Sequence, residues 1–135
     1  MEQQNALSRP EKLKSRKEID ALFAQRAGFA VAPVRVLYSI SQSPETDIKA
    51  GFGCSKRYFR HAVRRNRAKR LMREAYRTQK QALWQIASAN GQSLHLFFLF
   101  SHNELISCAA MQNVFAIILQ KLGKILENKM PRIQE

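Results

Sequence analysis

Basic residues gather in one segment of this chain. Ten of its 23 Lys and Arg residues lie between Lys56 and Arg77, where Glu74 is the one acid. Like charges at this density repel one another and lower stability unless an anionic partner neutralises them. A charge run can also be an ordinary solvated helix face, but this one carries most of the formal net charge of +13. The expected partner is therefore a phosphate backbone, either RNA or DNA.

A helix from about Ala62 to Ala87 is expected to carry this charge. At 100° per residue, apolar side chains gather on one of its sides and polar or basic side chains on the other. The apolar side comprises Ala68, Leu71, Met72, Ala75, Ala82, Leu83 and Ile86. The basic side comprises Asn66, Lys69, Arg70, Arg73, Arg77 and Lys80. If the apolar side packs on a sheet, the basic side must face outward as one surface.

The chain before this helix predicts an arm, a first helix and two strands. Residues 1–14 are polar and are expected to form an extended N-terminal arm. The S-x-x-E spacing that begins at Ser15 is that of a capping box at a helix start, and Gly28 can close the helix in a left-handed conformation. Alternating apolar residues then predict strands over Val34–Ser41 and Ile48–Ser55, which we expect to pair as a hairpin.

Two further elements complete the predicted domain. Leu94–Phe100 is nearly all apolar, which is typical of a buried central strand. Apolar residues from Met111 to Leu126 recur at helical spacing and predict a long C-terminal helix. The element order indicates an α+β fold, a two-layer α/β sandwich with one small central sheet. We expect a single domain over residues 15–127 and a flexible tail over residues 128–135.

The sequence has no arrangement typical of a catalytic or metal site. Cys54 and Cys108 are the two cysteines, no CxxC motif occurs, and the three histidines are scattered. Paired acids and glycine-rich phosphate loops are also absent. We therefore predict neither catalytic nor metal-binding residues. The sequence contains no run of about 18 apolar residues that could span a bilayer, so we expect no membrane partner. The scarcity of cysteines fits a reducing compartment, so we expect a cytoplasmic protein.

The segment from Gly51 to Glu74 resembles a known family. Gly51-Phe52-Gly53-Cys54-Ser55-Lys56-Arg57 is followed by Ala62-Val63, then by Arg65-Asn66-Arg67, Lys69-Arg70-Leu71 and Arg73-Glu74. Arg-Asn-Arg, Lys-Arg-Leu and an Arg one helical turn later are the hallmark of the bacterial ribonuclease P protein component. The resemblance extends over roughly residues 7–126.

Members of that family are the small protein subunit of a ribonucleoprotein that removes the 5′ leader from precursor tRNA. The resemblance implies that catalysis belongs to an RNA subunit and its bound magnesium ions. The implied partners are that catalytic RNA subunit and precursor tRNA, and not DNA. The implied fold is a sandwich in which the basic helix crosses between parallel strands with a left-handed connection, against the usual right-handed rule.

The resemblance also implies two sets of site residues. The first set would dock the RNA subunit, because arginine grips phosphate with paired donors and asparagine both donates and accepts. It comprises Arg57, Arg60, Arg65, Asn66, Arg67, Lys69, Arg70 and Arg73. The second set would line a cleft that holds the leader, where aromatic faces can stack on unpaired bases. It comprises Ile19, Phe23, Tyr38, Ser55 and Lys56.

Two positions depart from the family pattern. Ile19 stands where the family usually has an aromatic residue, so one stacking contact is replaced by an apolar one. The family's usual acid just before the late strand is missing from Gly91-Gln92-Ser93-Leu94. Core packing is the alternative role for Phe23 and Tyr38.

Two other functions fit the basic surface. A ribosomal or other structural RNA-binding protein would need the same charge and fold class. A DNA-binding helix-turn-helix needs a second short helix before the recognition helix, but Ile48–Ser55 is predicted as a strand. Cleavage of RNA by the protein alone would need an acid–base constellation, which the sequence lacks.

Overall fold

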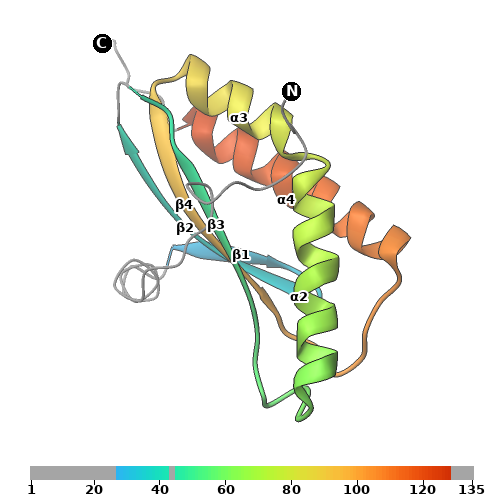
Figure 1. The fold of residues 1–135 in the computed structure, drawn as a ribbon. Coiled ribbons are helices and arrows are strands. Elements are labelled where there is room, and N and C mark those ends of the chain that lie inside the picture. Colours follow the sequence, from blue (N-terminus) through green and yellow to red (C-terminus); the bar gives the residue numbers. More distant parts are fainter. Residues whose placement is uncertain (1–26, 43–44, 129–135) are drawn as a thin grey trace.

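A computed structural model describes residues 27–42 and 45–128. Within them, four strands and three helices follow in the order β1, β2, β3, α2, α3, β4 and α4 (Figure 1). The strands are Gly28–Val31 (β1), Val34–Gln42 (β2), Ile48–Cys54 (β3) and Gln92–Phe100 (β4). The helices are Ala62–Arg77 (α2), Lys80–Ala89 (α3) and Cys108–Asn128 (α4). The predicted helix at Ser15, the arm and most of the tail lie outside the described residues.

The four strands form one mixed sheet in the order β1-β2-β4-β3. β2 is antiparallel to both β1 and β4, whereas β3 is parallel to β4. The predicted hairpin of Val34–Ser41 with Ile48–Ser55 is therefore wrong, since β4 lies between those strands. Along β4, fully buried residues alternate with partly buried ones, and none is exposed. The nearly all-apolar sequence of β4 is therefore explained by its position inside the sheet, with β2 on one side and β3 on the other.

Gly28 opens β1 and does not end a helix as predicted. A Cβ at this position would lie 2.2 Å from the backbone carbonyl oxygen of Val36 on β2. Glycine is therefore required because two backbones approach each other closely here. β1 has only four residues, too few for the alternation of its side chains to stand out in the sequence.

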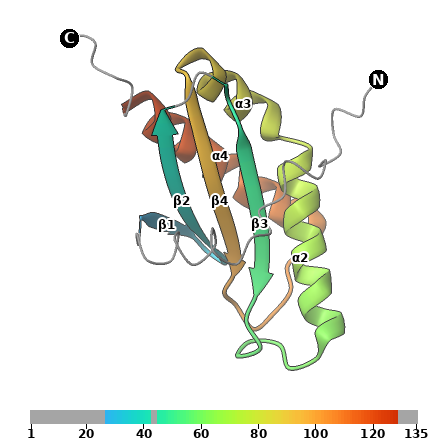
Figure 2. The same cartoon turned by 60° about the vertical axis from the view of Figure 1, so that its left-hand side comes forward.

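The parallel strands β3 and β4 are joined through α2 and α3. Figure 2 shows both strands running downward, β4 to the left of β3 and the helices behind the sheet, which is a left-handed crossover. The single predicted helix Ala62–Ala87 is wrong, because it is broken at Thr78 and Gln79. The Thr78 hydroxyl donates toward the carbonyl oxygens of Glu74 and Ala75 at 3.1 and 3.3 Å. Such side-chain bonds to the preceding turn compete with continuation of the helix.

The helices cover one face of the sheet (Figures 1 and 2). An aromatic core lies between the helices and the sheet. Phe98 at its centre is fully buried. Its ring lies 5.4 Å from Phe52 of β3, 5.5 Å from Tyr76 of α2 and 5.0 Å from Phe115 of α4. This one strand residue therefore ties α2 to the sheet and to α4. The predicted two-layer α+β sandwich is confirmed for the described residues.

Candidate RNA-binding surface

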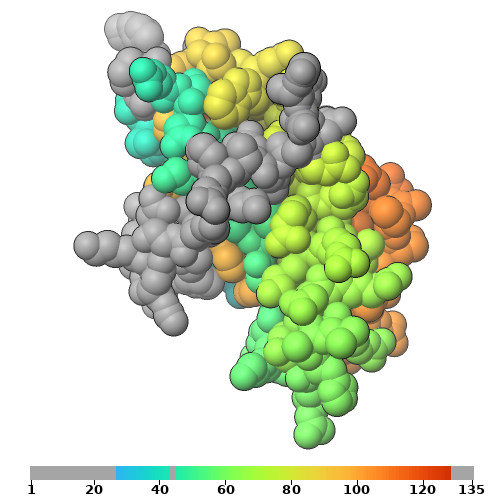
Figure 3. Space-filling model, in the orientation of Figure 1, coloured from blue at the N-terminus to red at the C-terminus, as the bar shows by residue number. Residues whose placement is uncertain are grey.

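The first half of α2 presents basic side chains to solvent. Its buried residues are Ala68, Met72, Ala75 and Tyr76, so the remaining arc of the helix faces outward. Asn66, Arg67, Arg70 and Arg73 are exposed and Lys69 is half-buried. Figure 3 shows α2 and the loop before it as a continuous exposed band that ends in a tip. Because α2 has no acid in its first turn, positive charge concentrates toward that tip.

The charge of this surface does not extend along the whole predicted stripe. Arg77 is half-buried and forms an ion pair with Glu74, one turn earlier on α2. Lys80 is 8% exposed and lies in α3, so its predicted place on the outward basic side is wrong. In a continuous helix Lys80 would lie on the basic side, but the break between α2 and α3 changes the direction in which it points. The candidate surface therefore ends near Arg73.

A second row of basic side chains faces the sheet edge. The Arg73 guanidinium lies 5.5 Å from the centre of the Phe52 ring on β3. Arg65 and Lys69 lie close enough to Cys54, at the end of β3, for their charges to affect its thiol. Burial raises the pKa of Cys54, and the two positive charges partly oppose that rise. At a spacing of four residues, Arg65, Lys69 and Arg73 thus follow β3 along one side of α2.

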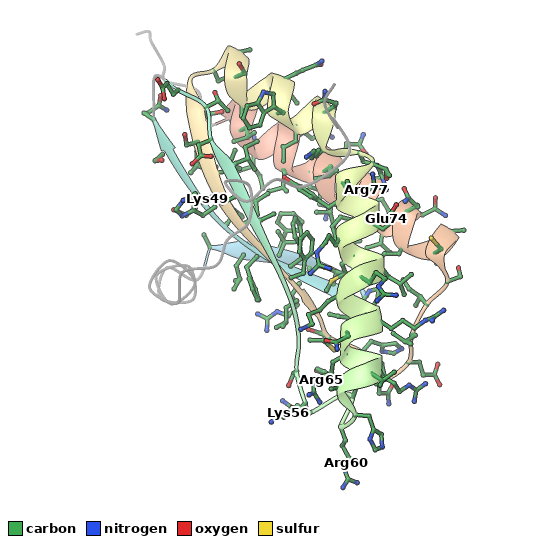
Figure 4. All side chains as sticks on the ribbon, viewed as in Figure 1. Lys49, Lys56, Arg60, Arg65, Glu74 and Arg77 are labelled. Atoms are coloured by element: carbon green, nitrogen blue, oxygen red, sulfur yellow. The ribbon has the colours of Figure 1, made fainter. Side chains whose placement is uncertain are left out.

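The loop from Ser55 to His61 continues the surface beyond α2. Lys56, Arg57 and Arg60 are exposed there, and Figure 4 shows Arg60 at the tip of the molecule. Arg64, which is missing from the predicted site, is also exposed, and its guanidinium lies 5.3 Å from the Phe59 ring centre. Its position within the basic run is the signal in the sequence from which its place on this surface could have been predicted.

The structure does not bring the described members of the predicted leader cleft together. Ile19 and Phe23 lie outside the described residues. Tyr38 is half-buried beside Phe29, with ring centres 6.3 Å apart. Tyr38 pairs with Leu96 on β4, and Leu96 pairs with Ala50 on β3, so Tyr38 lies level with Ala50 in the sheet. Ser55 comes five residues after Ala50, which is about 16 Å farther along the strand direction. Ser55 and Lys56 instead belong to the basic loop of residues 55–61, so they are grouped with α2.

The described residues form neither a metal site nor a membrane-spanning helix. Across residues 27–42 and 45–128, no three His, Cys, Asp or Glu side chains are placed to share a metal ion. In the same part of the chain, no helix is both long enough and apolar enough to cross a bilayer.

Comparison with known proteins identifies the family. The family model described as Ribonuclease P matches residues 7–128. The chain belongs to this family. It is 31% identical to the ribonuclease P protein component of Chlorobaculum tepidum, over 97% of this chain and 90% of that protein. The same component of Porphyromonas gingivalis is 41% identical over 57% of each chain, so the match spans little more than half of that relative.

Solved structures of ribonuclease P proteins share the fold of this family member. The protein of Staphylococcus aureus superposes with a TM-score of 0.61 at 16% identity, covering 82% of this chain and 94% of that one. The protein of Thermotoga maritima gives a TM-score of 0.62 at 15% identity, covering 82% of this chain and 96% of that one. Helices on one face of a mixed sheet are thus typical of the family.

Proposed function

We propose that this chain is the protein subunit of ribonuclease P and binds a catalytic RNA subunit. The observation that carries the proposal is the exposed basic arc of α2, formed by residues of the Arg-Asn-Arg and Lys-Arg-Leu motifs in a member of the family. Arginine donors in this arrangement can pair with phosphate oxygens through two parallel hydrogen bonds. The holoenzyme would remove the 5′ leader of precursor tRNA endonucleolytically, in the cytoplasm.

We place no catalytic step on the protein. Magnesium ions bound by the RNA subunit would supply the chemistry, while the protein would neutralise phosphate charge and hold the RNA in place. Contact with the leader stays a prediction for Ile19, Phe23, Tyr38, Ser55 and Lys56. Among these, Ser55 and Lys56 belong to the basic loop of residues 55–61, where Lys56 is exposed and Ser55 is half-buried.

The RNA that copurifies with the tagged protein tests this proposal against a ribosomal role. From its native bacterium at moderate salt, we expect one dominant species, the catalytic RNA subunit. A variant with Arg67 and Arg70 replaced by Ala should recover less of it, which controls for RNA bound nonspecifically to the resin. Recovery of intact ribosomal subunits, at equal yield from both proteins, would favour the structural RNA-binding alternative.

A further inference from the structure

The loop between β3 and α2 is held by hydrogen bonds to Ser55 and by one buried aromatic ring. The carbonyl oxygen of Ser55 accepts the amide hydrogens of Tyr58 and Phe59 at 3.1 and 3.4 Å. The Ser55 hydroxyl oxygen accepts the amide hydrogen of Arg57 at 3.0 Å. Phe59 is 3% exposed, and its ring stacks on Phe100 with ring centres 6.0 Å apart. One buried aromatic side chain thus anchors a loop that also carries Lys56, Arg57 and Arg60.

Arg65 joins α2 to this loop. Its Nη1 atom donates to the carbonyl oxygen of Phe59 at 2.9 Å and to that of Arg60 at 2.7 Å. Both bonds are charge-assisted, and both donors of that nitrogen are used within the protein. The backbone amide of Arg65 also donates to the carbonyl oxygen of His61 at 3.3 Å, in the first turn of α2. Arg65 therefore closes the loop onto the start of the helix.

The position of the Arg65 guanidinium differs from that of its neighbours in the motif. Arg65 is half-buried, whereas Asn66 and Arg67 are exposed. Its charge lies near the Cys54 thiol at the end of β3, so the side chain points back toward the sheet. In Figure 4 it lies where α2 meets the loop, and Arg60 extends away from it at the tip.

We infer that Arg65 is a positioning residue for RNA binding and does not itself grip phosphate. By tying the Phe59 and Arg60 carbonyls to α2, it holds Arg57 and Arg60 in a fixed place relative to Arg67 and Arg70. The loop and the helix then meet the RNA as one preorganised surface, without the cost of ordering the loop on binding. This inference rests on the proposed function, and it revises the interpretation that Arg65 docks the RNA directly.

Amide hydrogen exchange on the free protein tests the geometry without RNA. In Arg65→Gln, exchange at the Tyr58 and Phe59 amides should accelerate about tenfold or more, because two charge-assisted bonds are lost. Arg67→Gln, which removes the same charge from an exposed position two residues later, should leave these rates unchanged. Equal rates in the wild type and in Arg65→Gln would overturn the inference.

A double-mutant cycle on RNA binding tests the consequence. Arg65→Gln should weaken affinity for the RNA subunit about tenfold in the wild type, but less than about threefold where Arg57 and Arg60 are already Ala. Arg67→Gln should cost nearly the same in both backgrounds. If Arg65→Gln costs as much without Arg57 and Arg60 as with them, Arg65 contacts RNA directly and the inference fails.

Arg65→Lys provides a second variant that keeps the charge. A lysine can still meet a phosphate as a point charge, but its side chain is one atom shorter, so its ammonium does not reach the place from which Nη1 bonds both carbonyls. It should therefore behave like Arg65→Gln in both experiments, and near-native affinity would contradict the inference. Unfolding of both variants would also contradict it, because Arg65 would then be needed by the core. If the wild type itself does not bind the RNA subunit, the proposed function fails, whatever the exchange rates show.

Discussion

Replacing Arg67 and Arg70 together by alanine is expected to weaken binding to the RNA subunit by about 2–6 kcal/mol, at about 1–3 kcal/mol for each lost contact. Both side chains are exposed on the outward arc of α2. Their removal leaves the buried side of the helix intact, so the melting temperature should change little. Affinity is measured by titrating labelled RNA subunit with protein at several salt concentrations.

The salt dependence identifies the kind of contact that the double substitution removes. Each lost phosphate contact should reduce the slope of log affinity against log salt concentration by about 0.9. Replacing Lys121 and Lys124 by alanine removes the same charge from exposed positions on α4 and should change the slope little. A fall in stability with an unchanged slope in the Arg67 and Arg70 variant would show that these side chains support the fold.

Phe98→Ala is expected to lower the free energy of unfolding by about 3–5 kcal/mol. Phe98 is fully buried and touches rings from β3, α2 and α4, so its truncation opens a cavity where the layers meet. A loss of this size is a large part of the about 5–15 kcal/mol that stabilises a typical domain. Urea denaturation followed by circular dichroism measures it.

Phe97→Ala is the matched control for this substitution. Phe97 precedes Phe98 on β4 but is half-buried and points to the other face of the sheet. We expect a clearly smaller loss from Phe97→Ala. An equal loss from both variants would contradict the account of Phe98 as the core residue where β3, α2 and α4 meet. RNA affinity should fall for Phe98→Ala only under conditions where the protein begins to unfold.

Local patterns in the sequence were sufficient to predict most elements but not how they pair. Alternation in Val34–Ser41 and Ile48–Ser55 predicts two strands, because it depends on each strand's own side chains. Pairing depends on which strand gains most from a place in the middle of the sheet. That strand is β4, more than 35 residues later, so the assumption that neighbouring strands pair as a hairpin failed.

The sequence was sufficient to predict which residues form the candidate site, but it did not predict much of their geometry. Charge density and helical spacing correctly placed Asn66, Arg70 and Arg73 on an exposed arc. The break at Thr78 has no Pro or Gly to mark it, and it moved Lys80 into a buried position. The bonds from Arg65 to the Phe59 and Arg60 carbonyls depend on how the loop folds back over the start of α2, which periodicity does not describe.

The most direct test of the central claim is reconstitution of precursor tRNA cleavage from purified parts. The rate at which the mature 5′ end forms is measured for the protein alone, for the RNA subunit of the same bacterium alone, and for both together with magnesium. The account predicts no specific cleavage by the protein alone, because no described group of its residues is placed to hold a catalytic metal ion. It predicts faster cleavage at the mature 5′ end when protein joins the RNA subunit. Specific, metal-dependent cleavage by RNA-free protein, or no effect of the protein on the RNA subunit, would contradict the account.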